Sequence, residues 1–361
     1  MTRTPTPDTM EPKVKTEAEV EEEANTESPI PQPASTSAPA ATSMLPSRMF
    51  IITIHPNGTN SLSSILDLPN QPSTMAIDNL LSGAFETCFE SSRPTNRRRL
   101  ISNTQKAIHR NLVDADYAWA HAFRQGKVLC ANICAPWLIN PTVLNLYPAP
   151  SHVMAQGEMF KARVPASYAS SALDGLFNYT NMNLSMFPDE YVRTWGMTFV
   201  IVHPVVLFPL IYRALRYSLL PDIQHSCALH MTYHWTVTLY KWAQADSAAP
   251  EPIIIDADAL IEIPGHLASM FCQQTGLHLD LGLVRFEDAK AHREARLWND
   301  KDYRDRFIRL TAEGRSTLDA VIELAKPGWV ADFGTVAAEV IGDAVGAAQD
   351  DYMYLYDRRL Q

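Results

Sequence analysis

A short polar loop near the start of the chain carries the residue types best suited to chemistry. In IITIHPNGTNSLSSIL, residues 51–66, an apolar run ends at His55, and four polar side chains follow: Asn57, Thr59, Asn60 and Ser61. A loop of this kind between a strand and a helix can turn backbone N–H groups, amides and hydroxyls toward an anion. The loop contains no Lys or Arg. It is therefore predicted to bind a ligand through hydrogen bonds rather than through a formal positive charge.

A second histidine occupies an equivalent place later in the chain. His203-Pro204 ends an apolar run, just as His55-Pro56 ends the first one. Histidine exchanges protons near neutral pH, so His55 and His203 are the candidate catalytic acids or bases. The alternative for each is that it only orders its turn through backbone hydrogen bonds.

Two other groups of reactive side chains give weaker signals. His230 and His234 have the i,i+4 spacing that can hold zinc on a helix, but no third ligand is evident. Cys130 and Cys134 fit neither a redox motif nor a zinc knuckle, and they are predicted to be buried apolar cysteines. No metal site is predicted.

The elements that must position these residues alternate along the chain. Buried strands are predicted over 49–55, 127–133, 198–202 and 252–256, and helices over 205–220, 227–245 and 264–275, the last closed by Gly276. The last 50 residues indicate helices with a loop at AKPGW, residues 325–329. This alternation predicts an α/β fold with a parallel sheet covered by helices and a helical C-terminal part. Ligands of such sheets bind beyond the carboxyl ends of the strands.

The charge is divided between a polar tail and the rest of the chain. The 361 residues are 46% apolar with a net charge of −10, and residues 1–45 hold eight acidic and three basic side chains, a net −5. The tail is rich in Pro, Ser, Thr, Ala and Glu and lacks aromatic residues, so it is predicted to be disordered. Residues 46–361 are predicted to form a single domain.

Composition also excludes several classes of partner. The acidic balance argues against nucleic acid, which needs a basic face. The longest apolar run, 199–212, is short and broken by two prolines, so no membrane span is expected. Five cysteines without paired spacing and an acidic, polar N-terminus predict a cytoplasmic location.

Several motifs, in order, resemble the sulfotransferase-like proteins common in filamentous fungi. FPDEYVRTWGMTFVIVHPVVLFPLIYRAL (187–215) and PIIIDADALIEIPGHLASMFCQQTGL (252–277) are similar to two of that family's segments, and TIHPNGTNSLSSIL (53–66) resembles its opening loop. The resemblance covers residues 48–360 and implies a P-loop-type α/β fold. In active relatives this fold binds 3′-phosphoadenosine-5′-phosphosulfate, the sulfuryl donor.

By this resemblance the donor-binding positions are degenerate. The loop cation of the family falls at Asn57, and the Arg and Ser that bind the 3′-phosphate fall at Val202 and Leu210. The acid/base segment falls at Asn132–Cys134 and contains no carboxylate or imidazole. Arg213 matches a family arginine and is expected to pair with a carboxylate such as Asp256.

The sequence therefore predicts a sulfotransferase-fold protein of fungal secondary metabolism that uses no cofactor. It would act on a small apolar pathway intermediate by cyclisation, isomerisation or dehydration, with the polar loop as substrate-binding element. Segment 168–187 lies where the family has its variable acceptor pocket and would suit an uncharged ligand. Two alternatives stay open: a non-catalytic ligand- or partner-binding protein, and a donor-dependent sulfotransferase in which Arg216 or Arg315 replaces the missing cations.

Overall fold

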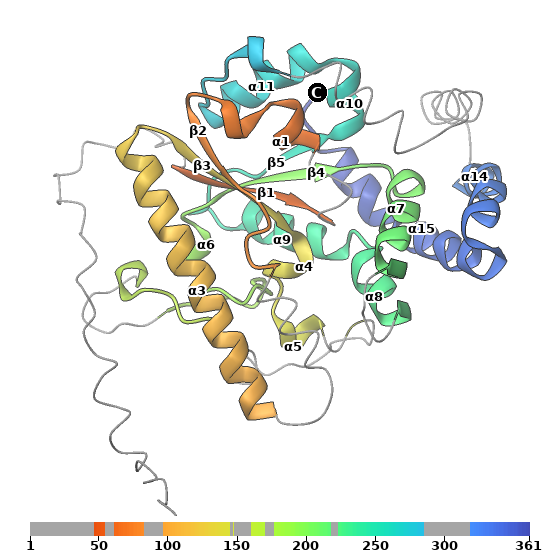
Figure 1. The fold of residues 1–361 in the computed structure, drawn as a ribbon, viewed down its shortest axis with the longest axis horizontal. Helices are drawn as coiled ribbons and strands as arrows, with labels where there is room; N and C mark the ends of the chain where they lie inside the picture. Colours follow the sequence, from red (N-terminus) through yellow and green to blue (C-terminus); the bar gives the residue numbers. More distant parts are fainter. Residues whose placement is uncertain are drawn as a thin grey trace, which may run out of the picture. The chain divides into compact units, whose positions relative to one another are not determined.

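The strands of the chain form one parallel sheet. The computed structural model describes residues 47–54, 61–82, 97–144, 147, 160–169, 177–217, 223–284 and 318–361. Its strands are β1 (Arg48–Thr53), β2 (Thr74–Ile77), β3 (Val128–Cys134), β4 (Gly196–Ile201) and β5 (Ile253–Asp256). They lie in the order β2-β3-β1-β4-β5 and every pair is parallel (Figure 1). The predicted α/β class with a parallel sheet is confirmed. The predicted tail, residues 1–45, lies outside the described residues.

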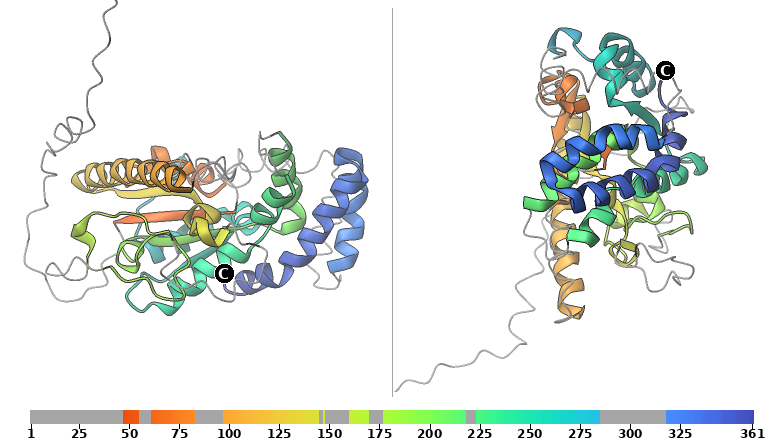
Figure 2. Two further views of the ribbon diagram at one scale, coloured as in Figure 1. Left: turned by 90° about the horizontal axis from the view of Figure 1, so that it is seen from below. Right: turned by 90° about the vertical axis from the view of Figure 1, so that its right-hand side faces the viewer.

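Helices cover both faces of this sheet. On one face α3 (Arg97–Arg124) packs against β3, and on the opposite face α9 (His234–Ala245) packs against β4 (Figure 2). The other α-helices are α1 (Ser61–Ile65), α4 (Ala135–Leu138), α5 (Pro141–Leu144), α6 (Asp189–Val192), α7 (Pro204–Tyr217), α8 (Ile223–His230), α10 (Ala257–Glu262), α11 (Pro264–Thr275), α14 (Leu318–Phe333) and α15 (Thr335–Tyr356). Because α14 and α15 pack together and contact α7, the C-terminal part is helical, as predicted.

Four of the strands match the sequence prediction, and one does not appear in it. The predicted strands over 49–55, 127–133, 198–202 and 252–256 correspond to β1, β3, β4 and β5 and are confirmed. The remaining strand, β2, has only four residues, TMAI, and three of them are half-buried. Its sequence is too short to carry a clear pattern, and its pairing with β3 defines it as a strand.

The single helix predicted over 227–245 is wrong. α8 ends at His230 and α9 begins at His234, so the chain leaves the helical path between them. The Thr232 hydroxyl accepts a hydrogen bond from the backbone N–H of His234 at 3.1 Å. Tyr233 extends to the end of β4, where it hydrogen-bonds Val202. These tertiary contacts outweigh the continuous helical pattern of the sequence.

The loop predicted at residues 325–329 is also wrong. α14 continues through Pro327, although proline removes one backbone hydrogen bond from a helix. Trp329 is buried on the same helix, and packing against α15 holds this turn in helical form. The chain turns instead at Gly334, whose φ of 87° favours glycine.

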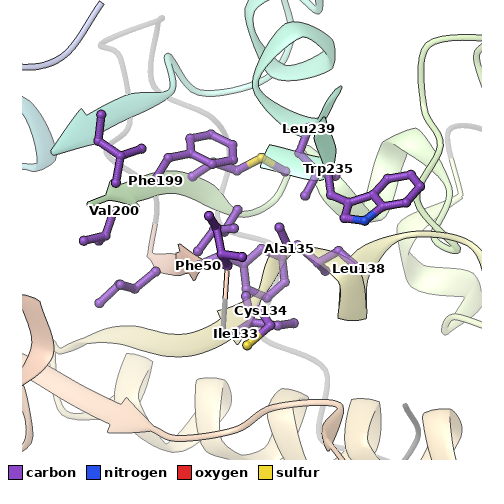
Figure 3. Close-up of a cluster of buried hydrophobic side chains, with 14 of the residues drawn as sticks. Phe50, Ile133, Cys134, Ala135, Leu138, Phe199, Val200, Trp235 and Leu239 are labelled. Atoms are coloured by element: carbon purple, nitrogen blue, oxygen red, sulfur yellow. The ribbon is translucent and has the colours of Figure 1, made fainter. Parts of the chain in front are cut away.

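The main core joins the central strands to α9 and α4. Phe50 of β1, Phe199 of β4 and Ile133 of β3 lie close to Trp235 of α9 and Leu138 of α4 (Figure 3). Full burial of such side chains contributes about 1.5–3 kcal/mol each. Within the described ranges, no helix has both the length and the continuous apolar character that crossing a bilayer requires.

One positive charge lies inside this largely apolar interior. Arg48, the first residue of β1, is 1% exposed and donates to Asp116 Oδ1 of α3 at 3.2 Å. It also donates to the hydroxyl and the carbonyl of Thr194, in the turn before β4. Its guanidinium lies 4.8–5.3 Å from the centres of four rings, those of Trp119, Tyr168, Tyr191 and Trp195. Arg48 therefore ties β1 to α3 and to the turn that precedes β4.

Replacing Arg48 is expected to destabilise the protein strongly. Arg48→Met should lower the free energy of unfolding by about 3–5 kcal/mol, because it leaves Asp116 without its buried partner. The matched control is Arg213→Met, since Arg213 pairs with Asp332 at 2.9 Å and both side chains are about half exposed. That change should stay within about 1 kcal/mol. Denaturant unfolding measures both, and equal losses would contradict the role assigned to Arg48.

Candidate functional site

The carboxyl ends of β3, β1 and β4 define the candidate site. β1 lies at the centre of the sheet between β3 and β4, and the chain reaches one side of it before crossing to the other. Ligands of open parallel sheets bind beyond the strand ends where the order changes direction in this way. The predicted residues His55, Asn57, Thr59 and Asn60 follow β1 but lie outside the described residues, and only the backbone of Ser61, at the start of α1, is described. Their roles remain predictions.

A tyrosine hydroxyl hydrogen-bonds the backbone at the end of β4. Val202, the first residue after β4, is 8% exposed, and its backbone N–H donates to Tyr233 Oη at 2.9 Å. The same hydroxyl donates to the carbonyl oxygen of Val202. Tyr233 is fully buried and packs against Phe208 and Tyr352. Both backbone polar groups of Val202 therefore have a protein partner.

The second position assigned to the donor phosphate is also aliphatic. Leu210 lies half-buried on α7, eight residues after Val202. Arg216, considered as a replacement cation, is exposed on the same helix, and Arg315 lies outside the described residues. That Val202 and Leu210 are lost donor contacts stays a prediction.

His203 lies directly beside this strand end. Its ring is half-buried and meets the ring of Tyr352 on α15 edge-to-face, with centroids 5.1 Å apart. Its Nδ1 accepts a hydrogen bond from the backbone N–H of Val205 at 3.2 Å. Burial lowers the pKa of His203 from 6.5 to about 4. At neutral pH the imidazole is uncharged, so it cannot replace a phosphate-binding cation, although it can still accept a proton.

A carboxylate that the sequence did not single out lies next to β3. Asn132 is buried on β3 and donates from Nδ2 to Asp78 Oδ1 at 2.5 Å. Its carbonyl accepts from the backbone N–H of Leu80 at 3.3 Å. Asn79 and Leu81 adopt φ values of 57° and 71°, a conformation that leucine rarely takes. The segment assigned to the acid/base has no carboxylate of its own, but the neighbouring strand end supplies one.

The two cysteines of β3 do not supply a nucleophile. Cys130 and Cys134 are free and buried, as predicted. Burial raises the pKa of the Cys130 thiol to about 12 and raises that of Cys134 as well. Reactive cysteines need a lowered pKa, so these thiols serve packing.

The two histidines with i,i+4 spacing do not share a helix, and one predicted ion pair is not formed. His230 and His234 belong to different helices, and the described part of the chain contains no cluster of three or more potential metal ligands. Arg213 pairs with Asp332 of α14 rather than with Asp256. Asp256, at the end of β5, lies 4.0 Å from the Nε of Arg359 near the C-terminus.

The polar residues of the segment before α6 bind protein carboxylates. Asp189 is fully buried and accepts hydrogen bonds from Asn183 Nδ2 at 2.6 Å and from the backbone N–H of Thr180 at 3.0 Å. Glu190 accepts from the Asn178 backbone N–H at 3.0 Å. The amides and hydroxyls read from the sequence as ligand contacts therefore anchor this segment to the start of α6.

His203 is expected to stay neutral down to about pH 4 in the folded protein. The unfolded chain takes up a proton near pH 6.5, so stability is complete above pH 6.5 and declines by about 3 kcal/mol as the pH falls to 4. Histidine NMR titration of the wild type and of His203→Asn assigns the signal, and the variant should lose this part of the pH dependence. A His203 titration near pH 6.5 would contradict the burial argument.

Removing the Tyr233 hydroxyl is expected to lower the free energy of unfolding. Tyr233→Phe leaves the buried N–H and C=O of Val202 without their partner, which should cost about 1–3 kcal/mol. Tyr117→Phe on the exposed side of α3 is the control, because Tyr117 is 72% exposed. Thermal unfolding compares the two. A negligible effect of Tyr233→Phe would mean that water or another group replaces the hydroxyl.

Two fungal proteins are similar to this chain over most of its length. The chain is 24% identical to sulfotransferase ppzF of Metarhizium rileyi over 348 aligned residues. These residues make up 88% of this chain and 97% of that protein. It is 25% identical over 357 residues to sulfotransferase ppzF of Metarhizium majus, covering 89% and 99%. No family model and no solved structure matches. Together with the parallel α/β sheet, these similarities support a sulfotransferase-like family.

Proposed function

We propose that this protein is an enzyme of fungal secondary metabolism that converts a small uncharged intermediate without using the sulfuryl donor. The observation that carries the proposal is the chemistry of the β4 end. Val202 is aliphatic, its backbone is engaged by Tyr233, and the neighbouring His203 is uncharged at neutral pH.

Electrostatics argues against a nucleotide at this strand end. The sulfuryl donor carries about four negative charges, and the attraction of a phosphate for a cation is strongest where water is excluded. Burying a phosphate against aliphatic side chains without a partner costs several kcal/mol, on the order of an unpaired buried charge. An apolar substrate meets no such penalty against Val202 and Leu210.

The same site suits a reaction that rearranges the atoms of one substrate. Cyclisation, isomerisation and dehydration need a positioned substrate and proton transfer, but no second substrate. The neutral imidazole of His203 and the carboxylate of Asp78 are proton-transfer groups at strand ends. His55 and the polar loop after β1 are the further predicted contributors.

A donor-dependent sulfotransferase is the second candidate. The observation that favours it is the name of the two relatives, which are called sulfotransferases and match along almost their whole length. On this alternative, cations from outside the positions of Asn57 and Val202 would bind the donor phosphates.

Calorimetric titration with adenosine 3′,5′-bisphosphate, the spent donor, separates the two candidates. The proposal expects no saturable heat up to about 1 mM, a binding free energy weaker than about 4 kcal/mol. Sulfotransferase ppzF of Metarhizium majus, run in parallel, serves as the matched control. Micromolar binding by this chain would favour the sulfotransferase.

A metabolite extract tests the activity directly. Extract from the source strain lacking this gene should accumulate the substrate, and the purified protein should consume it without added donor or metal. Mass spectrometry follows the loss of that compound and the appearance of the product. A reaction that begins only after 3′-phosphoadenosine-5′-phosphosulfate is added would overturn the donor-free proposal.

A further inference from the structure

An exposed imidazole lies at the start of α9, between two residues that contact the elements on either side of β1. His234 is the first residue of α9, and the residue before it, Tyr233, hydrogen-bonds Val202 at the end of β4. The residue after it, Trp235, lies beside Leu138 of α4, which follows β3 directly (Figure 3). Because β3 and β4 are the neighbours of β1, the start of α9 bridges the two sides of the candidate site.

Aromatic packing fixes the orientation of this imidazole. The ring of Tyr147 stacks on that of His234 with centroids 5.6 Å apart and planes 24° from parallel. Trp235 meets the imidazole edge-on at 4.8 Å, and it also contacts Tyr147. Among the residues that the structure describes, neither ring nitrogen of His234 has a hydrogen-bond partner, and the residue is exposed. The ring is thus held by packing while its nitrogens remain available.

Two charged groups act on His234 among the described residues. Partial burial lowers the pKa of His234 below 6.5, the Asp351 carboxylate of α15 raises it, and Lys241 of α9 lowers it. Burial raises the pKa of Asp351 in turn, and His234 lowers it. The imidazole is therefore neutral at pH 7, and its protonated form is stabilised by the carboxylate.

Helix α15, which packs against α7 and α9, carries one residue that acts on His203 and one that acts on His234. On α15, Tyr352 contacts the His203 ring and the adjacent Asp351 acts on His234. The two imidazoles differ in availability, because His203 is half-buried with Nδ1 accepting from Val205, whereas His234 is exposed. Of the two, His234 has the better access to a substrate.

We propose that His234 is the catalytic base of the donor-free reaction and that the charge of Asp351, on the helix α15 that packs against α9, stabilises its protonated form. This inference rests on the proposed function. A ring nitrogen takes a proton from a C–H or N–H group of an uncharged organic substrate, and the electron pair left behind forms a new bond to one atom of a C=C or C=O double bond in the same molecule. The π bond of that double bond breaks, and its electron pair takes the proton back from the imidazolium. Atoms and charge balance without any oxidant, reductant or co-substrate.

The extract assay tests this role with a matched pair of variants. His234→Gln should slow consumption of the accumulated compound by about 100-fold or more, the usual contribution of a general base, while its thermal unfolding stays close to wild type. His109→Gln, an exposed histidine on α3, should retain the wild-type rate. Added imidazole should partly restore His234→Ala, which a purely structural role would not produce.

Asp351→Asn supplies a test that does not depend on substituting the histidine. Without the carboxylate the pKa of His234 should fall, so the rising limb of the pH–rate profile and the His234 NMR titration should both move to lower pH. An unchanged His234 titration in Asp351→Asn would show that the Asp351 carboxylate does not stabilise the imidazolium, and would overturn that part of the proposal.

The outcomes separate the two proposals. If the wild type consumes the compound without donor and His234→Gln does so equally fast, the role of His234 is wrong and the donor-free function stands. If the wild type consumes nothing without donor, the proposed function fails and this inference fails with it.

Discussion

The buried guanidinium of Arg48 is the interaction on which the arrangement of the sheet depends. A charge removed from water must be paired, and this one is satisfied by Asp116 of α3 and by Thr194 before β4, inside a ring of aromatic side chains. Because Arg48 begins the central strand, its contacts fix β1 relative to the helix on one face and to the strand beside it. Arg48 makes these contacts at the end of β1 that lies opposite the candidate site.

The carboxyl edge is organised by side chains that arrive from later elements. Tyr233 leaves the helical path to satisfy the backbone of Val202, and this break separates α8 from α9 and makes His234 the first residue of α9. On α15, near the C-terminus, the ring of Tyr352 contacts that of His203, and the charge of the adjacent Asp351 acts on His234. The proposed proton transfer on a neutral molecule rests on this combination of an aliphatic strand end and an exposed imidazole.

Fold and chemistry rest on different numbers of residues in this chain. The chain is 24–25% identical to two fungal sulfotransferases along nearly their whole length, and its own apolar runs form a parallel α/β sheet. The chemistry depends on far fewer side chains, and a fold can retain its core while the groups at one edge change. Val202 illustrates the point: its aliphatic side chain is buried at the end of β4 and belongs to the core.

The sequence by itself determined the α/β class, four of the strands and the buried cysteines, because long apolar runs and their spacing report burial directly. The sequence placed a continuous helix over 227–245 and a break near Pro327, and both were wrong because contacts with Val202 and with α15 outweigh local preference. The predicted loop residues His55 to Asn60 lie outside the described residues, so their roles remain predictions. Only the tertiary structure joined Asp78 to Asn132 by a hydrogen bond and brought His234 within the electrostatic influence of Asp351. Each pair joins residues far apart in the chain, and no local pattern encodes which polar groups meet once strands and helices have packed.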